Sequence, residues 1–265
     1  MRKTKETLLE IKDLKLSYYS ENGKNTILEG FNLTLLEDEV VALVGASGCG
    51  KSSAALSILM LLGSNARIEK GEVLYKGRDL VKARPEYMAK IRGEEISIIF
   101  QEPLSALNPV FTIGYQMYEV FRYHSDLGKE KIYGKMVELL KLVGIAGAKE
   151  VIKYYPHQLS GGMRQRIVIA MSIALNPKLI IADEPTSNLD VTLQVQIIDL
   201  FKKLKEELGV SILLITHDLR AVEDIATKIN VMHKGRVIEE NITQIILRRP
   251  KEDYTKLLIK AADYQ

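Results

Sequence analysis

The sequence predicts an α/β fold in which a parallel sheet is interrupted by a long helical insertion. Three observations support this prediction. The apolar run Val40–Val44 does not alternate with polar residues, as is typical of a strand buried on both faces. Two further apolar runs, Leu179–Ala182 and Val210–Ile215, are separated by a helical pattern at Val191–Leu208, which indicates a β-α-β unit. Between about residues 112 and 177, apolar residues recur only at helical spacing.

The remaining elements are predicted from the same two periodicities. Alternating or apolar segments with Gly and Asn breaks predict a β-rich opening at residues 8–19 and 27–44. Further strands are expected at Glu72–Tyr75, Ile96–Phe100, Ile229–Met232 and Arg236–Glu239, the last two forming a hairpin around Lys234-Gly235. Helices are expected at Ser53–Leu62, Lys129–Val143 and Gly162–Leu175. We expect one domain over residues 1–240, with a helical subdomain at about 105–177, and a short tail at 241–265.

A glycine-rich segment follows the first buried strand and precedes a helix. It reads Gly45-Ala46-Ser47-Gly48-Cys49-Gly50-Lys51-Ser52, which is the G-x-x-x-x-G-K-[ST] pattern of a phosphate-binding loop. Glycines allow backbone N–H groups to close around phosphate oxygens at a helix N-terminus that carries partial positive charge. We expect Lys51 to reach the β- and γ-phosphates and the Ser52 hydroxyl to ligate Mg²⁺. A glycine-rich turn with a surface lysine is the alternative, but it would not explain the flanking strand and helix. The sequence therefore predicts that the chain binds a nucleoside triphosphate.

The residues of this loop and its helix that we expect to contact nucleotide are Gly45, Ser47, Gly48, Cys49, Gly50, Lys51, Ser52 and Ser53.

Two acids end a later apolar strand. In phosphate-loop enzymes an Asp at this position holds Mg²⁺ beside the loop serine, so Asp183 is the expected ligand. The next residue, Glu184, would then face the γ-phosphate, where a carboxylate can take a proton from the attacking water. An acidic strand end that merely starts a turn at Pro185 is the alternative.

A second glycine-containing helix start lies at Leu159-Ser160-Gly161-Gly162-Met163. Ser160 is a plausible N-cap, and the two glycines expose backbone N–H groups to an anion. Taken alone, the segment is no more than a capped helix. The sequence resembles, however, the signature motif of ABC-transporter ATPases, in which Gln usually stands where this chain has Met163.

Other motifs of that family occur in the expected order. Gln101, in Phe100-Gln101-Glu102-Pro103, is similar to the Q-loop, and Ser187-Asn188-Leu189-Asp190 is similar to the D-loop, where Ala is commoner than Asn188. His217 matches the switch histidine. Tyr18 matches the aromatic residue that stacks on adenine, with Tyr19 as a rival and a strand-packing role as the alternative. The resemblance covers nearly the whole chain.

The resemblance implies a phosphate-loop, RecA-like ATPase core with an antiparallel β subdomain and an inserted α-helical subdomain. It implies two such subunits arranged head to tail, with ATP and Mg²⁺ between the phosphate loop of one and the signature residues Ser160, Gly161 and Gly162 of the other. Gln101 would touch Mg²⁺, as would Ser52 and Asp183. Glu184, His217 and Lys51 would act on the γ-phosphate, and Asp190 of the D-loop would be among the nucleotide-binding residues.

Three stretches resemble the importers of peptides and nickel in particular: Gln101–Val110, Tyr155–Arg166, and Ile181–Thr186 followed by Leu189–Thr192. In that family two ATPase subunits pair on two membrane permeases fed by an extracytoplasmic binding protein, and this chain resembles the first ATPase. Many peptide-importing members continue past this point with a cysteine cluster, whereas this sequence stops at Gln265. The expectation therefore leans slightly toward a metal or metal–chelate cargo, with peptides nearly equal. Whether the partner ATPase is identical or different stays open.

Charge, cysteine content and hydropathy narrow the functional class of the protein further. The formal net charge is +3, so no basic field points to a nucleic-acid partner. The single cysteine, Cys49, excludes an internal disulfide; its place beside Lys51 at a helix N-terminus predicts a reactive thiolate, if reagents reach it. No apolar stretch approaches the roughly 20 residues that span a bilayer, so we expect a peripheral protein on the cytoplasmic face of the membrane. ABC ATPases of DNA repair or translation are the alternative, but neither a long coiled coil nor a second cassette is present.

Overall fold

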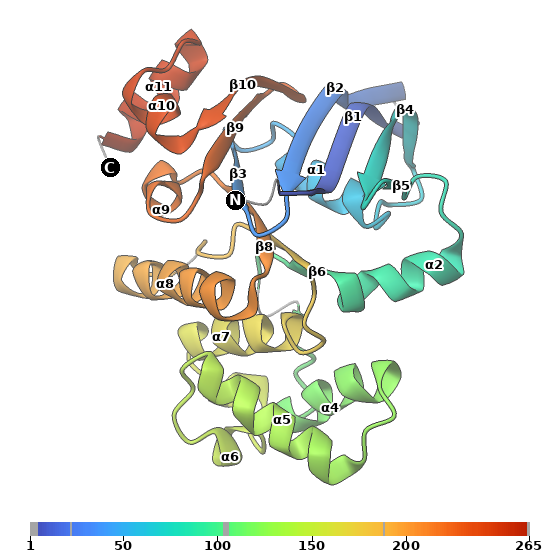
Figure 1. The fold of residues 1–265 in the computed structure, drawn as a ribbon, viewed down its shortest axis with the longest axis vertical. Coiled ribbons are helices and arrows are strands. Elements are labelled where there is room, and N and C mark those ends of the chain that lie inside the picture. Colours follow the sequence, from blue (N-terminus) through green and yellow to red (C-terminus); the bar gives the residue numbers. More distant parts are fainter. Residues whose placement is uncertain (1–4, 22, 103–105, 188, 264–265) are drawn as a thin grey trace.

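The computed structural model describes residues 5–21, 23–102, 106–187 and 189–263, and Figure 1 shows how the helices surround the sheets. The strands are β1 (Thr7–Ser20), β2 (Gly23–Leu36), β3 (Val40–Val44), β4 (Ala66–Tyr75), β5 (Arg78–Asp79), β6 (Ile96–Ile99), β7 (Leu179–Asp183), β8 (Ser211–Thr216), β9 (Lys228–His233) and β10 (Arg236–Ile242). The helices are α1 (Lys51–Ile58), α2 (Pro85–Lys90), α4 (Ile113–His124), α5 (Lys129–Leu142), α6 (Ala148–Val151), α7 (Gly161–Ser172), α8 (Val191–Leu208), α9 (Leu219–Glu223), α10 (Thr243–Arg248) and α11 (Asp253–Asp263).

A six-stranded sheet in the order β10-β9-β3-β8-β7-β6 forms the centre of the molecule. The pairs β3–β8, β3–β9, β7–β8 and β6–β7 are parallel, and β10 closes the sheet as an antiparallel edge strand. Because the carboxyl ends of parallel strands lie at one edge, the segments that follow β3, β6, β7 and β8 meet there. The predicted α/β fold is therefore confirmed.

Alternate residues of the central strands belong to two different cores. Val40, Ala42 and Val44 of β3 pack with helices α4, α5, α7 and α8 in one core. Val41 and Leu43 pack into the other, with the antiparallel strands and α1. Burial on both faces explains why β3, β7 and β8 read as continuous apolar runs in the sequence.

The β-rich opening forms a separate antiparallel sheet in the order β2-β1-β4-β5. Strand β4 begins at Ala66, six residues before the predicted Glu72, because its first half is an exposed polar segment paired with β1 rather than a core strand. The predicted segment 27–44 is divided in two, since a turn with Asp38 at a φ of 51° separates β2 from β3. Strand β5 and helix α2 were not predicted.

The region predicted as helical contains α4, α5, α6 and α7, which gather at the lower end of Figure 1. Helix α1 is shorter than predicted, because it ends at Ile58 and Met60 adopts a left-handed φ of 51°. The division into a domain of residues 1–240 and a tail stays a prediction.

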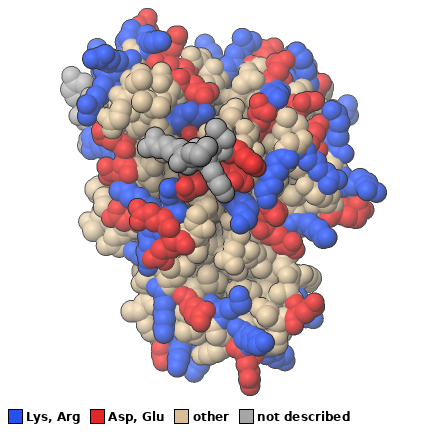
Figure 2. Space-filling model, in the orientation of Figure 1, with Lys and Arg blue, Asp and Glu red and all other residues tan. Residues whose placement is uncertain are grey.

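Charges of both signs are interspersed over the face of the molecule in Figure 2. Within the described ranges, every helix is either too short or too polar to cross a membrane.

Candidate functional site

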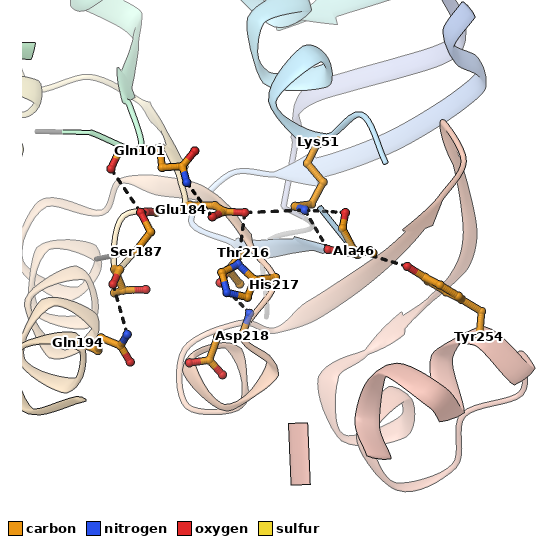
Figure 3. A network of polar contacts seen from close by, with 12 residues as sticks. Ala46, Lys51, Gln101, Glu184, Ser187, Gln194, Thr216, His217, Asp218 and Tyr254 are labelled. Carbon is orange, nitrogen blue, oxygen red and sulfur yellow. Dashed lines mark hydrogen bonds and ion pairs between the residues drawn. The ribbon is translucent and has the colours of Figure 1, made fainter. Parts of the chain in front are cut away.

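Four strand ends bring the predicted site residues to one edge of the central sheet. The phosphate-binding loop follows β3, and Gln101 lies just after β6. Asp183 ends β7 and is followed by Glu184, while His217 comes directly after β8. The parallel order of the strands thus assembles side chains that are far apart in the sequence (Figure 3).

The phosphate-binding loop is held on its inner side by the β9–β10 hairpin. Gly235 N–H donates to the Cys49 carbonyl over 3.0 Å. At Gly45 a Cβ atom would lie 2.3 Å from the Met232 carbonyl oxygen, so no larger residue fits there. Gly50, which precedes α1, has a φ of 109°, which an L-residue adopts only with strain. The packing and the backbone conformation of the loop therefore require glycine at positions 45 and 50, whether or not a ligand is bound.

Lys51 is folded onto its own loop. Its side chain is 5% exposed, and Nζ donates to the carbonyl oxygens of Gly45 at 2.8 Å and Ala46 at 3.2 Å. The same Nζ lies 3.8 Å from Oε1 of Glu184. Ser47, Gly48 and Ser52 are exposed on the outer side of the loop, where an anion can approach.

Glu184 is the centre of the polar network in Figure 3. Its Oε1 lies 3.3 Å from His217 Nδ1, and its Oε2 accepts from Gln101 Nε2 over 3.3 Å. Its carboxylate is 15% exposed, whereas the His217 side chain is 60% exposed. The structure therefore brings together Lys51, Gln101, Glu184 and His217, as predicted.

The backbone at Glu184 is also constrained. Its φ of 47° lies in the left-handed region, which is uncommon for a residue with a side chain and recurs at functional sites. Its N–H donates to the Ile215 carbonyl at 2.8 Å, which ties it to the end of β8. Ser187 Oγ donates to the carbonyls of Glu184 and Gln101, so the turn after β7 also holds the segment after β6.

Asp183 provides the test of whether a cation fits this edge. Its side chain is 7% exposed, and its Oδ1 is buried without a hydrogen-bond partner. Burial raises the pKa of this carboxyl, opposed by a hydrogen bond from the Ser52 hydroxyl. A buried acceptor that lacks a partner and lies beside a hydroxyl fits a Mg²⁺ ion or its bound water, since Mg²⁺ is held by one or two carboxylates and substrate phosphates. Clusters of three or more His, Cys, Asp or Glu suited to a metal are absent from the described ranges.

The environment of Cys49 contradicts the predicted thiolate. The side chain is half-buried, and its burial raises the pKa of the thiol above the ordinary value, although Lys51 acts in the opposite direction. Desolvation of the charged form is the larger effect here. The prediction treated the packing of the loop only as a barrier to reagents and not as a cause of desolvation; in the structure, Sγ lies 2.9 Å from the position of a Cβ at Gly45.

The signature residues form a separate cluster. Ser160 caps α7, its Oγ accepting from Met163 N–H over 3.3 Å, and Asp190 caps α8 in the same way through Leu193 N–H at 2.9 Å. A Cβ at Gly162 would lie 3.0 Å from the Leu193 side chain, so the start of α7 packs against the start of α8. Within the part of the chain that the structure describes, no hydrogen bond or ion pair joins these residues to Lys51 or Glu184.

The two candidate adenine-stacking residues differ in their surroundings. Tyr18 is half-buried and packs on the core beneath the antiparallel sheet. Tyr19 is 38% exposed. Its hydroxyl donates to Glu69 at 2.7 Å, and the Arg67 guanidinium lies 5.3 Å from the centroid of its ring. Hydrogen bonds from Lys24 and Tyr19 lower the pKa of Glu69 to about 2. Tyr19 is thus engaged in a surface network and Tyr18 in the packing of the core, and the assignment of Tyr18 as the adenine-stacking residue stays a prediction. Asn188 and residues 103–105, parts of two predicted motifs, lie outside the described residues.

A cavity of about 520 Å³ opens between the network and the C-terminal helix. Its walls include Gln101, Glu184 and His217, which were predicted, and Arg220 and Leu258, which were not. Tyr254 of α11 also reaches the phosphate-binding loop, because its hydroxyl accepts from Ala46 N–H at 3.0 Å (Figure 3). Nothing in the sequence around Tyr254 indicates this contact, since 208 residues separate the two partners.

Comparisons with known proteins decide the family. Residues 28–187 match the family described as ABC transporter. The chain belongs to this family. It is 44% identical to the oligopeptide transport ATP-binding protein AppD of Bacillus subtilis, over 96% of this chain and 77% of AppD. It is 42% identical to the dipeptide transport ATP-binding protein DppD of the same organism, over 96% of this chain and 76% of DppD.

Among solved structures, the ATP-binding cassette MJ0796 in a dimeric, post-hydrolysis state bound to ADP and Pi has a TM-score of 0.79 and 29% identity. The match covers 89% of this chain and 99% of that cassette. The ABC chain described here is accordingly an ATPase of the transporter type, with the fold that its sequence predicts.

Proposed function

We propose that the chain is the first of two ATPase subunits of an importer that carries short peptides across the cytoplasmic membrane. The observation that carries this proposal is the identity of 42–44% with AppD and DppD, both named for peptide transport. The sequence alone slightly favoured a nickel or metal–chelate cargo, and these two relatives do not support that preference. The ATPase itself contacts no cargo in this proposal, so its own residues do not discriminate between the two.

In this proposal each residue of the network has one task. Lys51 leaves the carbonyls of Gly45 and Ala46 and turns to the β- and γ-phosphates of ATP. Glu184 takes the proton of the attacking water, a step worth about 10²–10⁴-fold in rate for a well-placed base. His217 lies 3.3 Å from Glu184 and orients the same water.

Ser52, Asp183 and Gln101 would hold Mg²⁺, which supplies charge neutralisation on the phosphates. The Asp183 oxygen that lacks a partner supports this assignment. Gln101 already donates to Glu184 over 3.3 Å, so its amide would move when it turns to the ion. Because Gln101 lies between β6 and α4 in the chain, such a movement would be passed to α4.

We propose that catalysis needs a second subunit. Ser160 and its glycines lie apart from Lys51 and Glu184 within one chain, so the N–H groups at the start of α7 would serve the nucleotide of a partner ATPase. The partner's equivalent residues would complete the site described here. Preorganised N–H donors of this kind stabilise charge in the transition state.

The membrane partners would dock on the helical side. A cavity of about 550 Å³ lies between β6, α4 and α7, lined by Phe100, Tyr123, His124 and Met171 among others. Phe100 and Tyr123 are exposed there at 39% and 80%, and neighbouring exposed apolar side chains can mark a protein–protein contact. A short segment of a permease subunit in this cavity would contact the connection to Gln101 directly.

Uptake by cells that carry the complete transporter tests the function. We expect Glu184→Gln in this chain to abolish uptake of radiolabelled di- and oligopeptides and to leave uptake of a free amino acid unchanged. Uptake of nickel or a nickel chelate that depends on Glu184, with no effect on peptides, would contradict the peptide proposal. Glu207→Gln, an exposed acid on α8 paired with Lys203, is the matched control and should transport normally.

A further inference from the structure

The C-terminal helix α11 contacts the ATP site at two places. At its first turn, the Tyr254 hydroxyl accepts from Ala46 N–H of the phosphate-binding loop at 3.0 Å. At its last turn, Arg220 donates to the Ala262 carbonyl at 2.5 Å, and Leu258, Ala261 and Ala262 line the cavity that contains Glu184 and His217. No motif of the sequence accounts for either contact.

The position of Tyr254 is fixed from outside the loop. Glu239 of β10 accepts from the backbone N–H groups of Lys251 and Glu252 at 2.9 and 3.1 Å, which anchors the start of α11 on the central sheet. The Tyr254 ring then packs on His233 at the end of β9, with ring centroids 4.0 Å apart and an angle of 39°. The phenol therefore reaches the loop from an anchored helix, and its hydroxyl accepts the hydrogen bond from Ala46 N–H.

Both sides of Ala46 are thereby restrained. Its carbonyl accepts from Lys51 over 3.2 Å, and its N–H donates to Tyr254. When Lys51 turns to a phosphate, it gives up its two loop carbonyls, while the contact of Ala46 N–H with Tyr254 stays, together with the bond from Cys49 N–H to the Ala46 carbonyl at 3.3 Å. The loop would otherwise have more freedom at the moment when it must hold the nucleotide.

We propose that Tyr254 is a positioning residue for the phosphate-binding loop, and that binding of ATP and docking of α11 are coupled through it. The proposal rests on ATP binding by the chain and not on the cargo. Coupling between two sites is reciprocal, so a restraint that favours nucleotide also makes nucleotide favour the docked helix. Loss of the hydroxyl lowers the fraction of molecules whose phosphate-binding loop has the conformation that binds ATP. The apparent affinity for ATP falls by the same factor as this fraction.

Tyr254→Phe removes the hydroxyl and keeps the ring on His233. We expect its affinity for MgATP, measured by titration calorimetry on the purified chain, to fall about 2- to 10-fold, the range expected for one hydrogen bond that water can partly replace. In the assembled transporter, KM for ATP should rise by the same factor while kcat stays within about twofold. Lys256→Ala, on the exposed side of the same helix and paired with Asp253, is the matched control and should bind as wild type does.

Hydrogen exchange separates positioning from mere packing. In the wild type, MgATP should slow amide exchange in residues 256–262, and in Tyr254→Phe it should leave those rates unchanged. Equal affinity of Tyr254→Phe and wild type would overturn the proposal, even with a lower melting temperature, because the contact would then be only structural. A wild-type chain that bound no nucleotide would contradict the ATP-binding assignment and this proposal together, whereas unchanged affinity of the variant contradicts the proposal alone.

Discussion

The chain contains two helix starts rich in glycine, and they are held very differently. The phosphate-binding loop before α1 is restrained by a lysine that is 5% exposed, by the β9–β10 hairpin and by a tyrosine of the C-terminal helix. The start of α7 has one cap from Ser160 and a contact of Gly162 with Leu193. Both present backbone N–H groups to an anion. This difference supports the proposal that one half of the ATP site is organised within the chain and that the other half serves a partner subunit.

The largest expected effect comes from the organised half. Glu184→Gln should keep ATP binding and lower hydrolysis by the assembled transporter about 10²–10⁴-fold, because the carboxylate beside His217 is the proposed base. Steady-state phosphate release and equilibrium ATP binding measure the two properties. The variant should accumulate as a closed, ATP-loaded dimer. Near-normal turnover by the variant would contradict the proposed role of Glu184.

The second largest effect tests the half that is offered to a partner. Ser160→Ala in this chain should leave its own ATP affinity unchanged and slow hydrolysis at the partner's phosphate-binding loop about 10²-fold, the loss typical of one preorganised donor. Single-turnover hydrolysis in complexes with one variant subunit measures it. Thr112→Ala removes an N-cap of the same length, 3.3 Å, from α4 and controls for the loss of a cap alone. Equal slowing by both variants would show that only helix stability was changed.

A smaller effect is expected from the loop backbone. A Cβ at residue 45 would lie 2.3 Å from the Met232 carbonyl oxygen, so Gly45→Ala must displace the loop and should weaken MgATP binding by about tenfold or more. Gly128→Ala is the control, because its Cβ meets no atom within 4 Å and its φ of −66° suits any residue. Calorimetric titration of both variants, with thermal unfolding alongside, measures the difference. Binding of MgATP by Gly45→Ala at wild-type affinity would show that the loop can move to accommodate the added methyl group without weakening nucleotide binding.

The smallest effect concerns the thiol in the loop. Because burial raises the pKa of Cys49, little thiolate is present at neutral pH, and alkylation by a maleimide should be slow. The rate should rise about tenfold per pH unit between pH 7 and 9 without a plateau, since the reactive form increases until the pH passes the raised pKa. Alkylation should inactivate the ATPase, with MgATP protecting, and Cys49→Ser should remove the sensitivity while keeping activity. A rate that is already constant above pH 7 would indicate a low pKa and contradict the structure.

Sequence predicts the centre of the fold well and its margins less well. The strands β3, β7 and β8 are apolar on both faces, so their position follows from composition, and the residues that end them follow from the parallel order. The first half of β4 is polar and exposed, and it becomes a strand only by pairing with β1. No periodicity within that segment could have indicated it.

The same division applies to the site. Lys51, Asp183, Glu184, Gln101 and His217 each belong to a local motif, which the sequence displays directly. The contact of Tyr254 with Ala46 depends on how a distant helix docks, and the raised pKa of Cys49 depends on packing in three dimensions. Local patterns carry no information about either.

The register of β7 has a consequence for insertions and deletions. Ala182 pairs with Ile99 of β6 and with Leu214 of β8, and Asp183 pairs with Ile215. Neighbouring residues of a strand point to opposite faces, so a shift by one residue exchanges them. Removal of one residue from Leu179–Ala182 would bring Glu184 to the place of Asp183 and leave no carboxylate beside His217. The length of β7 is therefore constrained by the site as strictly as the identity of the acids that follow its apolar residues.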